Sequence, residues 1–197
     1  MALNFILPLN KLVVITAPSG SGKTSIARFL EKSCVPKLSF SISATTRNPR
    51  KDEVHGEHYY FLSVQEFNSR IKKNLFLEYE KFYNGQYYGT LESEIQRIWN
   101  SNEHVLLDIE VDGAENIKTL YPDQSLILFI DTPNPKTLVE RLKRRNTESE
   151  ESLQSRIKRI DYEIKKTKRI MDCSVMNINL DLAQKEALTL VEKFLNR

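Results

Sequence analysis

The sequence has few cysteines and no long apolar run, and each of these shortages excludes a class of protein. Two cysteines, Cys34 and Cys173, stand in 197 residues. They leave room for one disulfide, but we favour two thiols in a reducing cytosol. No run of apolar residues approaches the ~20 that a membrane helix needs. The apolar start MALNFILPLN lacks a basic leader and a small-residue cleavage site. We therefore expect a cytoplasmic protein with no membrane partner.

The excess of positive over negative charge is also small. A formal net charge of +3 is too small to argue for a nucleic-acid partner, and we expect none. The 40% hydrophobic and 28% charged fractions are typical of a folded globular chain. The length allows one core domain with small insertions. Nothing in the sequence indicates an oligomeric state.

Short apolar runs alternate with segments of helical spacing along most of the chain. Several runs are almost continuously apolar, as in parallel sheets that are covered on both faces. This alternation predicts an α/β fold with a parallel sheet. The expected strands are 12–16, 104–109, 125–130 and 174–178, and the expected helices are 25–33, 91–100, 114–121, 135–145 and 182–194.

Two stretches interrupt the alternation. From about residue 38 to 90 the chain is rich in Thr, Tyr, Phe and Arg with turn residues, which indicates a small β-rich insert. From about 136 to 168 charged residues dominate, among them Arg156, Lys158 and Arg159. Taken alone, that run is best interpreted as a solvated helical face. The expected division is a core of 1–40, 91–135 and 169–197, an insert of 41–90 and a further segment of 136–168.

The first strand leads into the loop APSGSGKT, which matches the phosphate-binding pattern GxxxxGK[ST] except that alanine stands first. Glycines allow a tight loop whose N–H groups converge on an anion, and the following helix adds its positive end. A strand before and an amphipathic helix after make an ordinary Gly-Ser turn a poor alternative. The expected ATP-binding residues of this loop are Ala17, Pro18, Ser19, Gly20, Ser21, Gly22, Lys23 and Thr24. Lys23 is expected at the β- and γ-phosphates and Thr24 at Mg²⁺.

Two acids stand at the end of the second expected strand of the core. Asp108 ends an apolar run, where P-loop enzymes keep an acid near Mg²⁺. Glu110 lies two residues on and so shares a strand face with it. We expect Asp108 to help hold Mg²⁺, directly or through water. An exposed strand-end acid remains an alternative for Glu110.

The insert carries a compact set of donors directed at phosphate. Arg47 and Arg50 offer guanidinium groups, which bind phosphate oxygens bidentately, and Tyr59 adds a hydroxyl. These residues belong to SISATTRNPRKDEVHGEHYYF. Together with APSGSGKT, the pattern resembles the nucleoside-monophosphate site of guanylate kinases. NLFLEY, YYGT, LDIEVDG, RLKRRNTESEESLQSR and SVMN follow in the order of that family, from about residue 11 to the C-terminus.

The resemblance implies a three-layer P-loop kinase core, a β-rich GMP-binding insert and a helical lid over 136–168. It implies transfer of the γ-phosphate of ATP to GMP, with Mg²⁺. Around the GMP phosphate it places Arg47, Arg50, Tyr59 and Tyr88. Around guanine it places Ser43, Glu78, Thr90 and, less specifically, Glu110, with Asp108 nearby. Lys23, Arg145 and Arg156 are implied at the transferring phosphoryl group, Asn177 at adenine, and Thr24 and Asp108 at Mg²⁺.

The sequence departs from the family pattern in four places and leaves two alternatives open. Alanine replaces the first loop glycine, the segment 83–86 is one residue longer than the usual loop, Asp112 replaces glutamine and Asn146 replaces glycine. One alternative is a P-loop kinase for another small phosphorylated acceptor, which Ser43 and Glu78 argue against. The other is a non-catalytic guanylate-kinase-like binding module. Such a module keeps acceptor-site arginines and loses ATP-site chemistry, whereas this chain keeps Lys23 and Thr24.

Overall fold

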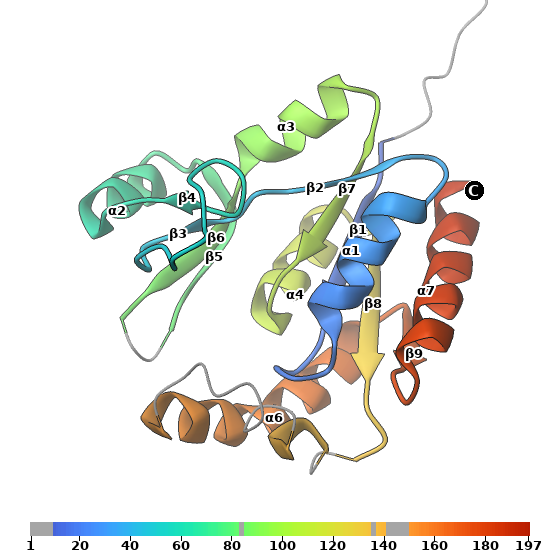
Figure 1. Cartoon of the computed structure of the whole chain (residues 1–197). Coiled ribbons are helices and arrows are strands. Elements are labelled where there is room, and N and C mark those ends of the chain that lie inside the picture. The colour runs from blue at the N-terminus through green and yellow to red at the C-terminus, as the bar shows by residue number, and fades with distance from the viewer. Residues whose placement is uncertain (1–9, 83–84, 135–136, 141–149) are drawn as a thin grey trace, which may run out of the picture.

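The computed structural model describes residues 10–82, 85–134, 137–140 and 150–197, with the backbone alone at 150–153, 155 and 156. These residues form a larger sheet between helices and a smaller sheet beside it (Figure 1). We call them the core sheet and the insert sheet. Among the described residues, no helix is long and apolar enough to cross a membrane.

The core sheet has five parallel strands in the order β2-β7-β1-β8-β9. Its first strand lies at the centre, paired with β7 on one side and β8 on the other. Every residue of β1 is buried, as its unbroken apolar sequence predicts. The strands are β1 (Leu12–Thr16), β2 (Leu38–Phe40), β7 (His104–Asp108), β8 (Ser125–Asp131) and β9 (Cys173–Met176).

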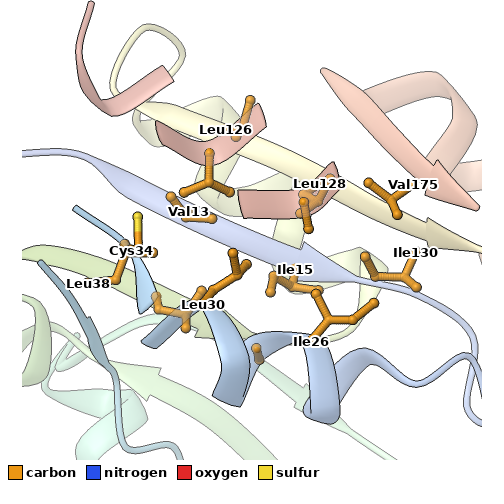
Figure 2. Close-up of a cluster of buried hydrophobic side chains, with 14 of the residues drawn as sticks. Val13, Ile15, Ile26, Leu30, Cys34, Leu38, Leu126, Leu128, Ile130 and Val175 are labelled. Carbon is orange, nitrogen blue, oxygen red and sulfur yellow. The ribbon is translucent and has the colours of Figure 1, made fainter. Parts of the chain in front are cut away.

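Helices cover both faces of the core sheet because successive strand residues point to opposite faces. Val13 and Ile15 pack with Ile26 and Leu30 of α1, a cluster that continues into α7 (Figure 2). Leu12 and Val14 pack on the other face, against α3 and α4. Burying one such side chain contributes roughly 1.5–3 kcal/mol. The helices are α1 (Lys23–Ser33), α3 (Glu92–Asn100), α4 (Val111–Leu120), α6 (Glu150–Ile170) and α7 (Leu180–Leu195).

The insert sheet has four strands in the order β4-β3-β6-β5. Strands β3 and β4 are parallel, whereas β6 runs antiparallel to both β3 and β5. Phe67 of α2 packs beneath this sheet, with its ring centroid 4.3 Å from that of Phe76. The elements are β3 (Ala44–Thr45), β4 (Tyr60–Phe61), α2 (Val64–Lys72), β5 (Phe76–Lys81) and β6 (Tyr87–Leu91).

The expected α/β fold with a parallel sheet is confirmed, and the differences are local. Helix α2 was not expected inside the insert, although Ser63 and Glu66 form the capping box that announces it. Helix α4 begins at Val111 rather than Ala114, because Gly113 lies within its first turn instead of preceding it. Of the helix expected at 135–145, residues 137–140 are helical and the others lie outside the described residues.

Candidate active site

The phosphate loop links the central strand β1 to helix α1. Gly20 and Gly22 both have a φ of 92°, a left-handed conformation that side chains strain. Gly22 is also the N-cap of α1 and supplies no side-chain cap, so the start of the helix is open to an anion. The loop therefore has the form that the sequence predicted.

Asn177, from the loop after β9, lies directly against this phosphate loop. Its Nδ2 donates to the carbonyl of Ser21 at 2.6 Å. A Cβ on Gly22 would stand 2.4 Å from the same Nδ2, so only glycine fits there. Asn177 is buried, and in this structure it supports the loop. This role was not foreseen for a residue expected at adenine.

The loop lysine lies between two acids at the carboxyl end of β7. Lys23 Nζ is 3.0 Å from Asp108 Oδ1 and 3.7 Å from Glu110 Oε1. It also donates to the carbonyl of Ile109 at 3.4 Å. Burial lowers the pKa of the ammonium, but Asp108 and Glu110 outweigh that effect and raise the pKa above its usual value. Lys23 is therefore charged at neutral pH and held in place.

Asp108 brings the expected Mg²⁺ residues together. Its Oδ2 accepts a hydrogen bond from the Thr24 hydroxyl at 3.1 Å, while its Oδ1 faces Lys23. A hydroxyl and a carboxylate are the hard oxygen donors that Mg²⁺ prefers. Within the described residues, no group of three His, Cys, Asp or Glu side chains could hold a metal alone. The pair fits Mg²⁺ in the usual form for ATP sites, where waters and phosphate oxygens complete the coordination.

Glu78 of β5 lies buried against Gly113 of α4, with 7% of its surface exposed. The Thr90 hydroxyl donates to its Oε1 at 2.5 Å. Its Oε2 lies where a Cβ on Gly113 would be 2.5 Å away, so the absence of a side chain on α4 makes its space. Burial raises the pKa of this carboxyl to about 7, although the Thr90 hydrogen bonds oppose the shift.

Two insert residues that were expected at phosphate, Arg47 and Arg50, are held by an acid to which the sequence analysis gave no role. Both nitrogens of the Arg47 fork donate to Glu53, at 2.7 and 2.8 Å. The backbone N–H of Arg50 donates to the same carboxylate at 2.7 Å. The hydrogen bonds from Arg47 lower the pKa of Glu53 to about 2. The Arg47 guanidinium also lies 5.2 Å from the centre of the Tyr59 ring, and Tyr88 contacts that ring edge-on.

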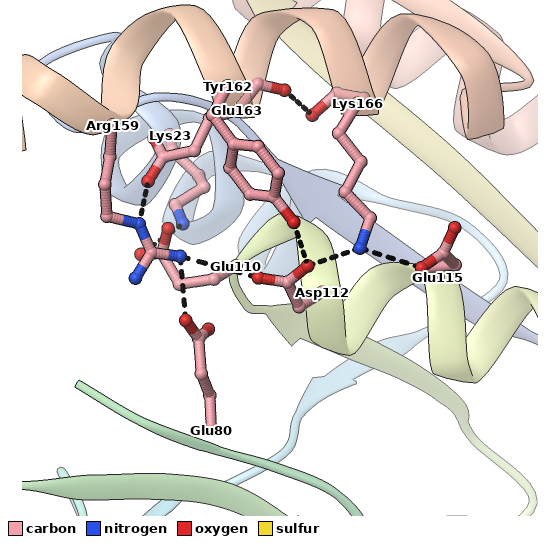
Figure 3. Close-up of polar contacts among 10 residues, drawn as sticks. Lys23, Glu80, Glu110, Asp112, Glu115, Arg159, Tyr162, Glu163 and Lys166 are labelled. Atoms are coloured by element: carbon pink, nitrogen blue, oxygen red, sulfur yellow. Dashed lines mark hydrogen bonds and ion pairs between the residues drawn. The ribbon is translucent and has the colours of Figure 1, made fainter.

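A network of charges joins α6 to α4 and to the insert (Figure 3). Arg159 donates to Glu80 of β5 at 2.7 Å and lies 3.5 Å from Asp112 of α4. Asp112 also accepts from the Tyr162 hydroxyl at 2.8 Å and from Lys166. The charge that Asp112 adds is thus neutralised within the protein. Only 22% of the Arg159 side chain is exposed, so the interpretation as a solvated face was wrong for this part of 136–168.

Glu163 lies on the same face of α6 and completes this network. Its Oε1 is 3.3 Å from Arg159 Nε. Burial, reinforced by the charge of Glu110, raises its pKa well above the ordinary range. No motif in the sequence pointed to Glu80, Arg159 or Glu163, because they lie in positions where a charge is usually solvated.

Two expected catalytic residues cannot be placed. Arg145 lies outside the described residues, and for Arg156 the backbone alone is described, within α6. The other expected residues divide between two groups. Lys23, Thr24, Asp108, Glu110 and Asn177 meet at the carboxyl ends of the core strands, and Ser43, Arg47, Arg50, Tyr59, Glu78, Tyr88 and Thr90 lie on the insert.

These features define a P-loop kinase. They are a parallel sheet with a phosphate loop after its central strand, a lysine held by two acids, and an insert that carries arginines and a buried carboxylate. The chain belongs to the guanylate kinase family, whose model matches residues 9–195.

Curated relatives support the same family. A guanylate kinase of Salinibacter ruber is 47% identical over 193 residues, which cover 96% of this chain and all of that protein. One of Bacteroides thetaiotaomicron is 39% identical over 187 residues, covering 95% of this chain and 91% of the relative. The crystal structure of the guanylate kinase from Anaplasma phagocytophilum shares the fold, with a TM-score of 0.72 at 21% identity. It covers 94% of this chain and 86% of that one.

Proposed function

We propose that the protein transfers the γ-phosphate of ATP to GMP, giving ADP and GDP, and that the two groups of site residues divide the substrates between them. The observation that carries this proposal is the buried carboxylate of Glu78, which accepts a hydrogen bond from Thr90 and occupies the space left by Gly113. Guanine presents N1–H and the 2-amino group side by side, and one carboxylate can accept from both. Adenine offers a lone pair at N1 and would leave the buried carboxylate unsatisfied.

The residues around Glu78 complete a GMP site. Ser43 donates to guanine O6, and Thr90 and Glu110 flank the base beside Asp108. Arg47, Arg50, Tyr59 and Tyr88 bind the GMP phosphate, and Glu53 holds Arg47 ready for it. The insert at 41–90 is in this proposal the GMP-binding unit.

The phosphate loop and its neighbours hold ATP. Residues 17–24 enclose the phosphates, and Asn177 supports the loop and meets adenine. Thr24 and Asp108 hold Mg²⁺, directly or through water, and the ion neutralises phosphate charge when it is bound. Lys23 and, from the lid at 136–168, Arg145 and Arg156 stabilise the transferring phosphoryl group. The GMP phosphate is already an anionic nucleophile, so positioning and charge stabilisation suffice. The core of 1–40, 91–135 and 169–197 holds these parts, and we expect the enzyme to act in the cytoplasm.

A panel of acceptors tests the proposal. With ATP and Mg²⁺, phosphorylation of GMP should exceed that of AMP, CMP and UMP by orders of magnitude in kcat/KM. Preference for another acceptor would support a P-loop kinase of different specificity.

Lys23→Met separates an enzyme from a binding module. The variant should fold and bind GMP while losing nearly all phosphoryl transfer, because Lys23 faces charge that grows in the transition state. Its kcat is measured beside its affinity for GMP. A variant that kept most of the wild-type kcat would favour the non-catalytic module.

A further inference from the structure

The chain passes from the core sheet to the insert sheet through three residues, and each is tied to a different element. The Ser41 N–H donates to the carbonyl of Leu106 in β7 at 2.9 Å. The Ser43 carbonyl accepts from the N–H of Tyr60 in β4 at 2.9 Å. Between them, the Ile42 N–H donates to a side chain, the carboxylate of Glu94, at 3.0 Å. We call residues 41–43 the crossover.

Glu94 is a buried acid in the first turn of α3, with 3% of its surface exposed. Its two oxygens accept four hydrogen bonds. Oε1 accepts from the Tyr60 hydroxyl at 2.8 Å and from Arg97 Nε at 3.0 Å. Oε2 accepts from Ile42 and, at 2.8 Å, from Arg97 Nη2. Hydrogen bonds from these partners outweigh the effect of burial, and the pKa of Glu94 lies below its ordinary value.

The same carboxylate therefore holds the crossover, a strand of the insert and a helix of the core. Arg97 strengthens the connection, since its Nη2 also reaches the carbonyl of Phe40 at 3.4 Å. Helix α3 starts at Glu92, two residues after Thr90, the partner of Glu78. Glu94 thus links the backbone beside Ser43 to the backbone beside Thr90. These are the two sides of the proposed guanine site.

A buried carboxylate with four donors resists displacement, because removing it would leave several donors unsatisfied. The distance between the crossover and the start of α3 is fixed by it. A hydroxyl that reads one edge of a base must be placed to within a fraction of an ångström. Ser43 adjoins Ile42, the crossover residue that Glu94 holds.

We propose that Glu94 is a positioning residue for guanine recognition, which sets the Ser43 hydroxyl relative to Glu78 and so controls how O6 of the base is read. This inference rests on the proposed function, which assigns O6 to Ser43 and N1–H with the 2-amino group to Glu78. Glu94 itself touches neither the base nor the phosphates.

The test uses two acceptors that each change one edge of GMP. In thio-GMP a sulfur replaces O6, and in IMP the 2-amino group is missing. The ratio of kcat/KM for GMP over thio-GMP reports the reading of O6, and the ratio for GMP over IMP reports the reading by Glu78. Glu94→Gln replaces one acceptor oxygen by an amide that faces N–H donors. Glu92→Gln, on the exposed side of the same turn, is the matched control.

Glu94→Gln should lower kcat/KM for GMP by about 10-fold, mainly through KM. It should move the ratio of GMP over thio-GMP toward one and leave both the ratio of GMP over IMP and the affinity for ATP unchanged. Glu92→Gln should match the wild type. An equal loss for all three acceptors, or an unchanged ratio of GMP over thio-GMP, would overturn the inference. If Glu94→Gln does not fold, Glu94→Asp is judged by the same ratios.

Ser43→Ala distinguishes this inference from the assignment on which it rests. In that variant the ratio of GMP over thio-GMP should also fall. If it stays at the wild-type value while Glu94→Gln lowers it, Glu94 positions a different O6 contact and the role of Ser43 is wrong. If the wild type does not phosphorylate GMP at all, the proposed function and this inference both fail.

Discussion

Gly113 shows how the absence of a side chain shapes a site. The Glu78 carboxylate lies in the space that a Cβ on Gly113 would fill, 2.5 Å from Oε2 and 2.9 Å from the carboxyl carbon. Glu78 is buried and has little freedom to move aside. One methyl group on α4 therefore decides whether this carboxylate can keep its position.

Gly113→Ala should lower kcat/KM for GMP by about 10²-fold, since a displacement of ~1 Å in a positioning group costs that much. Alanine favours a helix over glycine by up to ~1 kcal/mol, so α4 itself should not be weakened. The measurement is kcat/KM for GMP together with Kd for ATP, which should be unchanged. Wild-type efficiency would show that Glu78 does not read the base from this position.

Glu78→Gln tests the same carboxylate by its chemistry. The variant should lose roughly 10²-fold in kcat/KM for GMP, on the order of 3 kcal/mol, because a charge-assisted acceptor is lost. It should bind ATP as the wild type does. Kinetics with GMP and AMP decide the matter, since a surface acid in this place would change neither.

At this scale the sequence predicted residues that belong to local motifs. The phosphate loop and the insert arginines each form a short pattern with a chemical reason behind it. Glu53 lies within the insert pattern, three and six residues from its partners, but was given no role there. Glu94 and Arg159 were missed because they have partners far away in the sequence. Arg159 and Glu80 are 79 residues apart, and nothing in either neighbourhood indicates the other.

Helix α6 is the element on which the charge network depends. It reaches the insert through Arg159 and Glu80, and α4 through Lys166 and Asp112 (Figure 3). One oxygen of Glu80 is buried with no hydrogen-bond partner among the described residues. Glu80 therefore depends on Arg159 to offset its charge.

Arg159→Gln should raise KM for GMP severalfold with a smaller change in kcat, because the insert loses its connection to α6. Glu80→Gln should raise KM for GMP by less, since this variant leaves no buried acid without its cation. The double variant should be less impaired than the sum of the two, with a coupling of ~0.5–3 kcal/mol. Lys158→Gln, an exposed neighbour on α6, is the control. If the effects of the two single variants simply add in the double variant, Arg159 and Glu80 do not connect α6 to the insert.

Most strands of the core were predictable because buried parallel strands are short and continuously apolar. The exception is β2, whose three residues were assigned to the stretch that interrupts the core although they pair with β7. The helix expected at 114–121 begins three residues earlier, at Val111, and α2 was missed because aromatic residues around it indicated strands. The course of the insert sheet was beyond prediction. Strands β3 and β4 have only two residues each, too few to show a period.

The stability of the whole molecule should depend on the ionisation of Glu78. Its pKa is about 7 in the folded protein, against an ordinary value of 4.5. Below pH 4.5 the carboxyl is protonated in both the folded and the unfolded protein, so its burial as an ion does not lower the free energy of unfolding. As pH rises from there to 7 the unfolded chain releases the proton first, so stability falls by up to ~1.4 kcal/mol per pH unit. Above 7 the cost is constant.

Glu78→Gln should therefore gain on the wild type in free energy of unfolding as pH rises from 4.5 to 7, and keep that gain above 7. Urea unfolding across this range measures the difference between the two proteins. Glu53→Gln is the control, because the pKa of Glu53 is about 2 when folded and its contribution changes only in acid. A difference that did not vary with pH would mean that Glu78 titrates alike in both states.

The central place of β1 in the core sheet bears on how the chain is made. This strand leaves the ribosome before its two neighbours, β7 and β8, which begin about 90 and 110 residues later. Until Asp131 has emerged, the apolar residues of β1 have no complete sheet to join, and the phosphate loop that follows it has no firm support. Nascent chains that end before β8 should therefore not hold nucleotide. At this stage the exposed apolar residues of β1 offer a chaperone the largest surface to bind.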